Sequence, residues 1–423
     1  MQCWPQMTVP SPSRPVDPLL AAFAAGLASI LFLTSWALIH RGFYERDQIV
    51  DTPVYHRYGT AIDDGRVPYR DFGVEYPPGA LPAFVVPALS DADFQTFTRR
   101  FEGFMAVCGL ALLAFVAVAL AGLGAGARRL AAALGFVALA PLAVGSVVLS
   151  RFDLWPAALT AAALAALLSG RERLGHGALG LAVAAKLYPA VLAPLAVAYV
   201  WKRAGRREAM RCGAIMAGAT AIVVLPFLVL SPEGVWDSLT RQASRPLQIE
   251  SLGSAFLLAA HQAFGLDITM DSSHGSQNLA GTLPGVLAVL QALVQVAVLV
   301  AIWVAFARGP ADKERFVLAC AAVLTAFVAL GKVLSPQFLI WLIPVVPLVR
   351  GRRGLAASGL LAAALVLTQL WFPFRYWDLA LEFDGPASWL VLVRDLVLLG
   401  LLAVLALGLR ERYADGLAGG RAP

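Results

Sequence analysis

The sequence predicts an all-α polytopic integral membrane protein, and three observations lead to this fold class. Hydrophobic residues make up 59% of the 423 residues and charged residues only 14%, whereas soluble domains carry about 25% charged residues. Mean hydropathy is +0.73. Apolar runs of roughly 17–25 residues, long enough to cross about 30 Å of hydrocarbon as helices, recur along the chain.

The chain is expected to form one transmembrane domain between two tails. Residues 1–17 hold four prolines and no apolar run, which predicts a disordered tail and does not resemble a signal peptide. The membrane domain covers 18–410, and 411–423 form the second tail.

Ten full spans are expected. The apolar runs place them at about 18–39, 101–124, 130–149, 154–169, 209–230, 283–307, 315–331, 337–349, 354–370 and 387–409. Short clusters of Lys and Arg separate many of these runs. Ten spans plus one broken pair place every such cluster in the cytoplasm, as the positive-inside rule requires. Both tails are then cytoplasmic, and the protein is expected in the plasma membrane.

Two polar stretches, 40–100 and 231–282, then lie on the outer face. Within the first, the apolar piece from Ala80 to Leu89 is too short to span and holds two prolines, which predicts a re-entrant or interfacial segment. Within the second, Leu252 to Phe264 shows apolar residues at helical spacing and is expected to lie flat on the membrane.

The broken pair occupies residues 176–201. A single span there would place Lys202 and Arg203 outside, against the positive-inside rule. Pro189, in Lys186-Leu-Tyr-Pro, removes a helix hydrogen bond and disfavours helix in the residue before it. We therefore expect two half-helices that enter and return, with Lys186 facing a cavity. One continuous span remains the alternative, as does a Lys186 side chain that reaches the interface.

Composition and motifs exclude several classes of function. The net charge of +6 is dispersed in loops and gives no nucleic-acid stripe. The four cysteines show no CxxC spacing and predict buried thiols without disulfides or zinc. No nucleotide-binding phosphate loop and no metal-ligand motif is present, so the only cofactor-like molecule expected is the substrate donor, and the sequence leaves a divalent-metal requirement open.

The first outer stretch carries the candidate site. Asp51 directly follows the first helix, where a carboxylate could act as general base; a helix cap or solvated acid is the alternative. Asp63-Asp64-Gly65 reads as a turn. Aromatic rings beside charged groups suit sugar binding, and this stretch holds Tyr55, Tyr69, Arg70, Asp71, Glu75 and Tyr76.

Cations elsewhere on the predicted outer face form a possible phosphate site. Lys186 lies deep in an apolar run, where a charge is costly and commonly functional. Lys332, Arg245 and Arg151, the last close to Asp153, could join it. Glu250 follows Arg245 in the same segment. Taken singly, each of these cations reads as an ordinary interface arginine or lysine.

These residues resemble a known family. The first outer stretch contains Asp51-x-x-Val-Tyr55, then Gly65-x-x-Pro-Tyr69-x-x-Phe72, then Glu75-Tyr-Pro-Pro78. In this order they resemble the first outer loop of the polytopic GT-C glycosyltransferases, and more narrowly the actinobacterial α-1,2-mannosyltransferase family, glycosyltransferase family 87. Three later segments are similar to that family as well: Gly180–Pro189, Arg245–Ser251 and Leu334–Phe338.

The resemblance implies a GT-C bundle and a reaction. Such enzymes move a sugar, usually mannose, from a polyprenyl-phosphate donor to a glycolipid or wall glycan acceptor on the outer face, with inversion. Asp51 matches the family's general base. Lys186, Arg245 and Lys332 are expected at the donor phosphate. The other outer-face candidates, Glu250 among them, are expected at the sugar or acceptor.

Two alternatives remain at this point. A transporter or flippase of lipid-linked sugars would line a path with the broken helices and Lys186, but would spread its polar residues through the midplane. A scaffold without activity would leave the outer acids replaceable. Nothing in the residues separates mannose from arabinose or glucose, and the acceptor is equally open.

Overall fold

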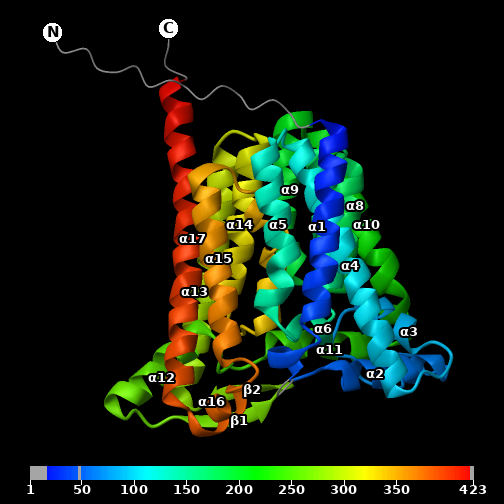
Figure 1. Cartoon of the computed structure of the whole chain (residues 1–423), viewed down its shortest axis with the longest axis vertical. Helices are drawn as coiled ribbons and strands as arrows, with labels where there is room; N and C mark the ends of the chain where they lie inside the picture. Colours follow the sequence, from blue (N-terminus) through cyan, green and yellow to red (C-terminus); the bar gives the residue numbers. More distant parts are fainter. Residues whose placement is uncertain (1–16, 46–48, 420–423) are drawn as a thin grey trace.

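The protein is a bundle of long helices with a layer of short elements at one end (Figure 1). The computed structural model describes residues 17–45 and 49–419. Within these ranges seven helices are long and apolar enough to cross a membrane. They are α1 (Pro18–Leu38), α4 (Phe94–Gly122), α5 (Ala127–Val144), α10 (Arg206–Leu230), α13 (Thr282–Arg308), α15 (Gly351–Trp371) and α17 (Gly385–Gly419). The expected all-α membrane fold class is confirmed.

Seven of the ten expected spans correspond to these helices, and the other three are shorter. The runs at 154–169 and 315–331 form α7 (Leu154–Leu168) and α14 (Lys313–Ala329), which are buried along almost their whole length. The run at 337–349 forms two 3-10 helices, η4 (Pro336–Leu342) and η5 (Val346–Leu348), because one proline precedes it and two interrupt it. These short elements pack in the interior of the bundle.

The expected broken pair is confirmed. Helix α8 (Glu172–Ala185) ends at Lys186, whose backbone is extended. The chain continues through η3 (Tyr188–Leu192) into α9 (Ala193–Ala204). Arg173 near the start of α8 pairs with Glu208, just after α9, at 2.7 Å. The start of α8 and the end of α9 therefore lie at the same end of the bundle, and the break at Lys186 lies away from that end.

The basic clusters gather at one end of the bundle, as expected. Arg129 at the start of α5 pairs with Glu314 at 2.6 Å, and Lys313 donates to the carbonyl of Gly122 at 2.7 Å. The start of α1 and the end of α17 lie at this end too (Figure 1).

The opposite end carries the short elements that replace the two expected loops. The first comprises η1 (Gly42–Glu45), α2 (Thr52–Asp63), η2 (Pro78–Ala80) and α3 (Pro82–Ala88). The second comprises α11 (Pro232–Ala243), α12 (Leu252–Phe264) and an antiparallel hairpin of β1 (Thr269–Ser273) with β2 (Ser276–Ala280). Helices α6 (Val147–Ser150) and α16 (Tyr376–Glu382) complete this end.

The two tails fall largely outside the description. Residues 1–16 of the N-terminal tail and 420–423 of the C-terminal tail lie outside the described residues. The backbone of α17 stays helical to Gly419, into the stretch expected as a tail.

Candidate active site

Asp51 and Arg151 form an ion pair at the end of the bundle that carries the short elements. Asp51 precedes α2 but its side chain makes no capping bond to that helix. Instead Oδ2 pairs with Nη1 of Arg151 and accepts a hydrogen bond from the hydroxyl of Tyr55 at 3.3 Å. The Asp51 side chain is 30% exposed, whereas Arg151 is buried. The carboxylate of Asp51 is therefore held in place by its partners and remains accessible to a substrate. It does not act as the helix cap that the sequence offered as the alternative.

A second ion pair lies two residues further along the chain. Lys186 Nζ lies 2.7 Å from Asp153 Oδ1, and the same oxygen accepts from Trp341 Nε1 at 2.6 Å. The ammonium also lies over the rings of Phe152, at 4.5 Å from the centroid, and Trp341, at 5.2 Å. Aromatic faces attract a cation, so these rings hold a largely enclosed lysine at the helix break.

Trp341 is the centre of an aromatic stack next to that pair. Its ring lies 4.1 Å, between centroids, from Tyr188 on one side and from Phe338 on the other. The 3-10 geometry of η4 and η3 brings these three rings together. The stack fixes the indole N–H toward Asp153.

The segment before α12 is joined to β2 by an isolated antiparallel bridge between Gln248 and Asn278. Gln248 donates its N–H to the carbonyl of Lys332, and Ile249 donates to Gln277, both at 3.0 Å. The Gln248 amide donates to Glu250 Oε2 at 2.6 Å and to Ser335 Oγ at 2.8 Å. These bonds bring two segments that were expected at the site, around 245–251 and 332–337, side by side.

Glu250 is a buried carboxyl in this segment, outside the spanning helices. Burial raises its pKa to about 8, while Arg394 and Arg151 act in the opposite direction. Arg394, buried within α17, donates from Nη2 to the Glu250 carbonyl at 2.7 Å. Burial also lowers the pKa of Arg245, which the charges of Glu75 and Glu250 partly oppose. At neutral pH Glu250 is therefore mostly protonated and can donate as well as accept a hydrogen bond.

Several buried polar atoms around these pairs lack a hydrogen-bond partner in the described part of the chain. They include Nε of Arg151, Nε of Arg245, Oε1 of Gln248, Oε1 of Glu250 and Oε1 of Gln277. A buried donor or acceptor without a partner costs about 1–3 kcal/mol. Such groups are the ones that the hydroxyl and phosphate oxygens of a polar ligand would engage.

The structure places the remaining tyrosines in structural contacts. Tyr55 is buried and stacks on Phe84 at 4.6 Å between centroids. Tyr76 lies 5.9 Å from Tyr55 and 5.8 Å from the Lys186 ammonium, so both border the ion pairs. Tyr69 is buried, and its hydroxyl donates to the Tyr76 carbonyl at 2.5 Å. Its ring supports the loop and is not brought to Asp51.

Four other expected residues do not join the two ion pairs. Arg70 and Asp71 are exposed and pair with each other at 2.9 Å. Glu75 faces the β1–β2 turn, where a Cβ on Gly275 would lie 3.5 Å from its Oε1. Lys332 donates to the Ala243 carbonyl at 3.0 Å. Arg245 is closer to the site, since its charge acts on that of Lys186.

Sequence reasoning missed three side chains of this site. Trp341 and Phe338 read as part of an apolar span. Phe338 ends a segment that resembles the family, but nothing local marks Trp341. Arg394 carried a signal, because Arg394-Asp395 interrupts the apolar run of the last span and intramembrane charges are commonly functional.

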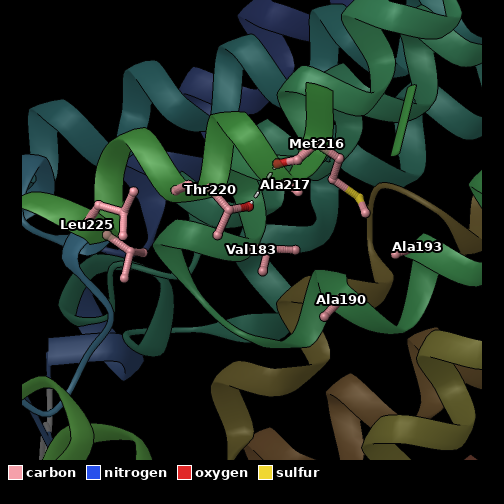
Figure 2. Close-up of a pocket in the computed structure, with 9 residues that line it drawn as sticks. Val183, Ala190, Ala193, Met216, Ala217, Thr220 and Leu225 are labelled. Carbon is pink, nitrogen blue, oxygen red and sulfur yellow. Dashed lines mark hydrogen bonds between the residues drawn. The ribbon is translucent and has the colours of Figure 1, made fainter. Parts of the chain in front are cut away.

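An apolar pocket of about 370 Å³ lies beside the helix break (Figure 2). It is formed by α8, η3, α9 and α10, and its lining comprises Val183, Ala190, Ala193, Met216, Ala217, Thr220, Ala221, Val224 and Leu225. The polar member, Thr220, donates its hydroxyl to the Gly180 carbonyl at 2.9 Å. The lining thus offers an apolar ligand almost no competing polar group.

Among the described residues no group of three or more His, Cys, Asp or Glu side chains could hold a metal ion. Cys108, Cys212 and Cys320 are buried free thiols, as expected. Cys3 lies outside the described residues.

The chain matches a protein-family model and is similar to solved structures. The model of glycosyltransferase family 87 matches residues 75–336. Among solved structures, the chain is similar to ArnT from Cupriavidus metallidurans bound to undecaprenyl phosphate, with 14% identity and a TM-score of 0.48 over 95% of this chain and 79% of that one. No curated protein matches the chain.

Proposed function

The chain belongs to glycosyltransferase family 87, and from this premise we propose that it moves mannose from a polyprenyl-phosphate donor to a glycolipid or wall glycan acceptor. Family membership makes it a membrane glycosyltransferase and removes the transporter alternative. The sugar, the acceptor, the stereochemistry and the base are parts of the proposal.

The observation that carries the proposal is the pair of adjacent ion pairs, Asp51–Arg151 and Lys186–Asp153, at one end of the bundle. They place a reachable carboxylate beside buried cations. A glycosyl transfer from a lipid phosphate needs both, one to receive the acceptor proton and the other to receive the leaving phosphate.

The reaction is a single displacement. The acceptor oxygen bonds to the anomeric carbon while the bond from that carbon to the phosphate oxygen breaks. Asp51 takes the proton of the acceptor hydroxyl, and polyprenyl phosphate leaves with the bonding electrons. The configuration inverts, through an oxocarbenium-like transition state.

Cations stabilise this transition state because the phosphate gains charge. The donor is a phosphodiester with one negative charge, and the product is a monoester that carries a second. Lys186 is the first candidate for this role, and Arg245, whose charge acts on that of Lys186, is the second. Lys332 bonds the Ala243 carbonyl and does not join the two ion pairs. We therefore assign it a contact with the donor phosphate as the donor enters the site.

The sugar and the acceptor are assigned to the surrounding polar and aromatic groups. Tyr76 borders the ion pairs, and ring faces pack on the C–H faces of sugars. Tyr55 is buried and would act there through its hydroxyl, which bonds Asp51. The free Oε1 of Glu250 can bond a sugar hydroxyl. We propose that the loop formed by Tyr69, Arg70, Asp71 and Glu75 binds the acceptor.

The apolar pocket supports the donor class. Val183 and Ala190, which line the pocket (Figure 2), lie shortly before and after Lys186 in the sequence. Helix α10 forms much of the pocket wall, and no residue of its most apolar stretch is buried inside the protein. A prenyl tail in this groove would reach the bilayer while its phosphate approaches Lys186. The basic end of the bundle faces the cytoplasm by the positive-inside rule, so the site faces outward from the plasma membrane.

The test uses the purified chain in lipid nanodiscs. It is incubated with decaprenyl-phosphate-linked mannose, glucose or arabinose and with extracted membrane glycolipids, with and without a chelator. We expect mannose transfer and a product of inverted anomeric configuration. Preference for another sugar would correct the donor, retention would refute the single displacement, and no transfer from any lipid phosphate would contradict the proposal.

A further inference from the structure

Arg151 occupies an unusual position for a residue beside the candidate base. Its guanidinium binds Asp51 Oδ2, the oxygen that also accepts from Tyr55. With both partners in place the lone pairs of this oxygen are engaged. A guanidinium beside a carboxylate stabilises the anion, so Asp51 in this pair is a weaker acceptor for the proton of an incoming hydroxyl than an unpaired carboxylate would be.

The same guanidinium lies within electrostatic reach of the phosphate candidates. The charges of Arg151 and Arg245 both act on Lys186, so three cations converge on one region. Asp51 pairs with Arg151 and Asp153 with Lys186, while no ion pair joins Arg245 to a described residue. The mutual repulsion of three cations favours the entry of an anion there.

Arg151 also has an unused donor that faces the interior. Its Nε is buried without a hydrogen-bond partner in the described chain. A guanidinium presents five N–H groups in a fixed fork that matches two oxygens of a phosphate. Asp51 uses only part of this fork, so a phosphate could compete for it.

We propose that Arg151 exchanges partners during the reaction: it holds Asp51 in the empty enzyme and turns to the lipid phosphate when the donor binds. This inference rests on the proposed function. Arg151 is then a catalytic residue with two consecutive tasks. It keeps the base engaged until the donor has arrived, and it stabilises the leaving phosphate afterwards.

The exchange has a consequence for the order of binding. Asp51 becomes a strong proton acceptor for the acceptor hydroxyl only after Arg151 has left it. Donor binding therefore precedes productive acceptor binding, and polyprenyl phosphate is the last product to leave.

A double-mutant cycle tests the exchange without turnover. Binding of radiolabelled decaprenyl phosphate to the full chain in nanodiscs is measured for wild type, Asp51→Asn, Arg151→Gln and the double variant. Asp51→Asn should bind several-fold more tightly, since no ion pair must break. Arg151→Gln should bind roughly 10-fold more weakly. In the Arg151→Gln background, Asp51→Asn should no longer tighten binding.

The cycle separates this inference from simple repulsion and from the proposed function. If Asp51 only repels the phosphate, its replacement tightens binding equally in both backgrounds, and the exchange is refuted. If wild type binds decaprenyl phosphate no better than decaprenol, the uncharged control lipid, the donor class itself is refuted.

A second measurement uses the unmodified enzyme and does not depend on how the variants fold. Product inhibition by decaprenyl phosphate should be competitive toward the donor and noncompetitive toward the acceptor. A random order of binding would overturn the exchange.

Discussion

Lys186 Nζ lies 2.7 Å from Asp153 Oδ1, although Lys186 ends α8 and Asp153 precedes α7. The contact lies at the break between α8 and α9, where the backbone of Lys186 is extended. The pair therefore joins the broken helix to the short segment between α6 and α7 that also carries Arg151.

Replacing Lys186 should cost both stability and donor binding. In Lys186→Ala the buried Asp153 keeps its bond to Trp341 but loses its cation, and breaking a buried pair from one side costs about 3–5 kcal/mol in the free energy of unfolding. In Lys186→Met combined with Asp153→Asn that loss should largely disappear, while decaprenyl phosphate binding stays weak. Denaturant unfolding in micelles and lipid binding measure the two effects; wild-type binding in the double variant would remove Lys186 from the phosphate site.

Glu250 should make the stability of the protein depend on pH. Its pKa in the folded protein is about 8, above the ordinary value of 4.5, so the folded state holds a proton that the unfolded state releases. The free energy of unfolding should fall as pH rises from about 4.5 to about 8 and then level off. Glu250→Gln should flatten this slope. Thermal unfolding at several pH values checks it, and an unchanged slope in the variant would assign the dependence to another group.

Blocking the apolar pocket should weaken binding of long lipids only. A tryptophan at Ala221, in the pocket wall, would displace several methylene groups of a prenyl tail and weaken decaprenyl phosphate binding roughly 10-fold. Ile222→Trp is the matched control, since Ile222 is 76% exposed on the same helix and does not line the pocket. Binding of a short-chain lipid phosphate should not change in either variant. Equal effects of the two tryptophans would place the tail elsewhere.

The orientation in the membrane is open to a labelling test. Ser272 in β1 and Arg207 at the start of α10 are exposed at opposite ends of the bundle. A cysteine at 272 should react with an impermeant maleimide in intact cells, and a cysteine at 207 only after the membrane is opened. The reverse pattern would place the site in the cytoplasm.

The parts of the fold that follow from local chemistry were predictable from sequence. Long apolar runs gave seven spans, and Pro189 gave the break at Lys186. The run at 337–349 misled because its length suggested a span, whereas its prolines dictate 3-10 turns. The run at 315–331 does form a helix, but tertiary packing on all sides, which no local pattern reveals, makes it a core element.

The site was predictable only in part, for a related reason. Asp51 and Lys186 stand out because charges beside or within apolar runs are costly. Their partners are set by tertiary contacts: Trp341 reaches Asp153 across 188 positions, and Arg394 reaches Glu250 across 144. Arg70 and Asp71 looked equally suitable in sequence, yet they pair with each other at the surface, which only the structure shows.

The transfer activity of Asp51→Asn tests the central claim most directly. The variant should lose transfer from decaprenyl-phosphate-mannose by roughly 10²–10⁴-fold, the range typical of a general base, while it still binds decaprenyl phosphate. Asp64→Asn, an exposed acid at the end of the same helix, is the control and should remain active. Near-normal transfer by Asp51→Asn would contradict the account.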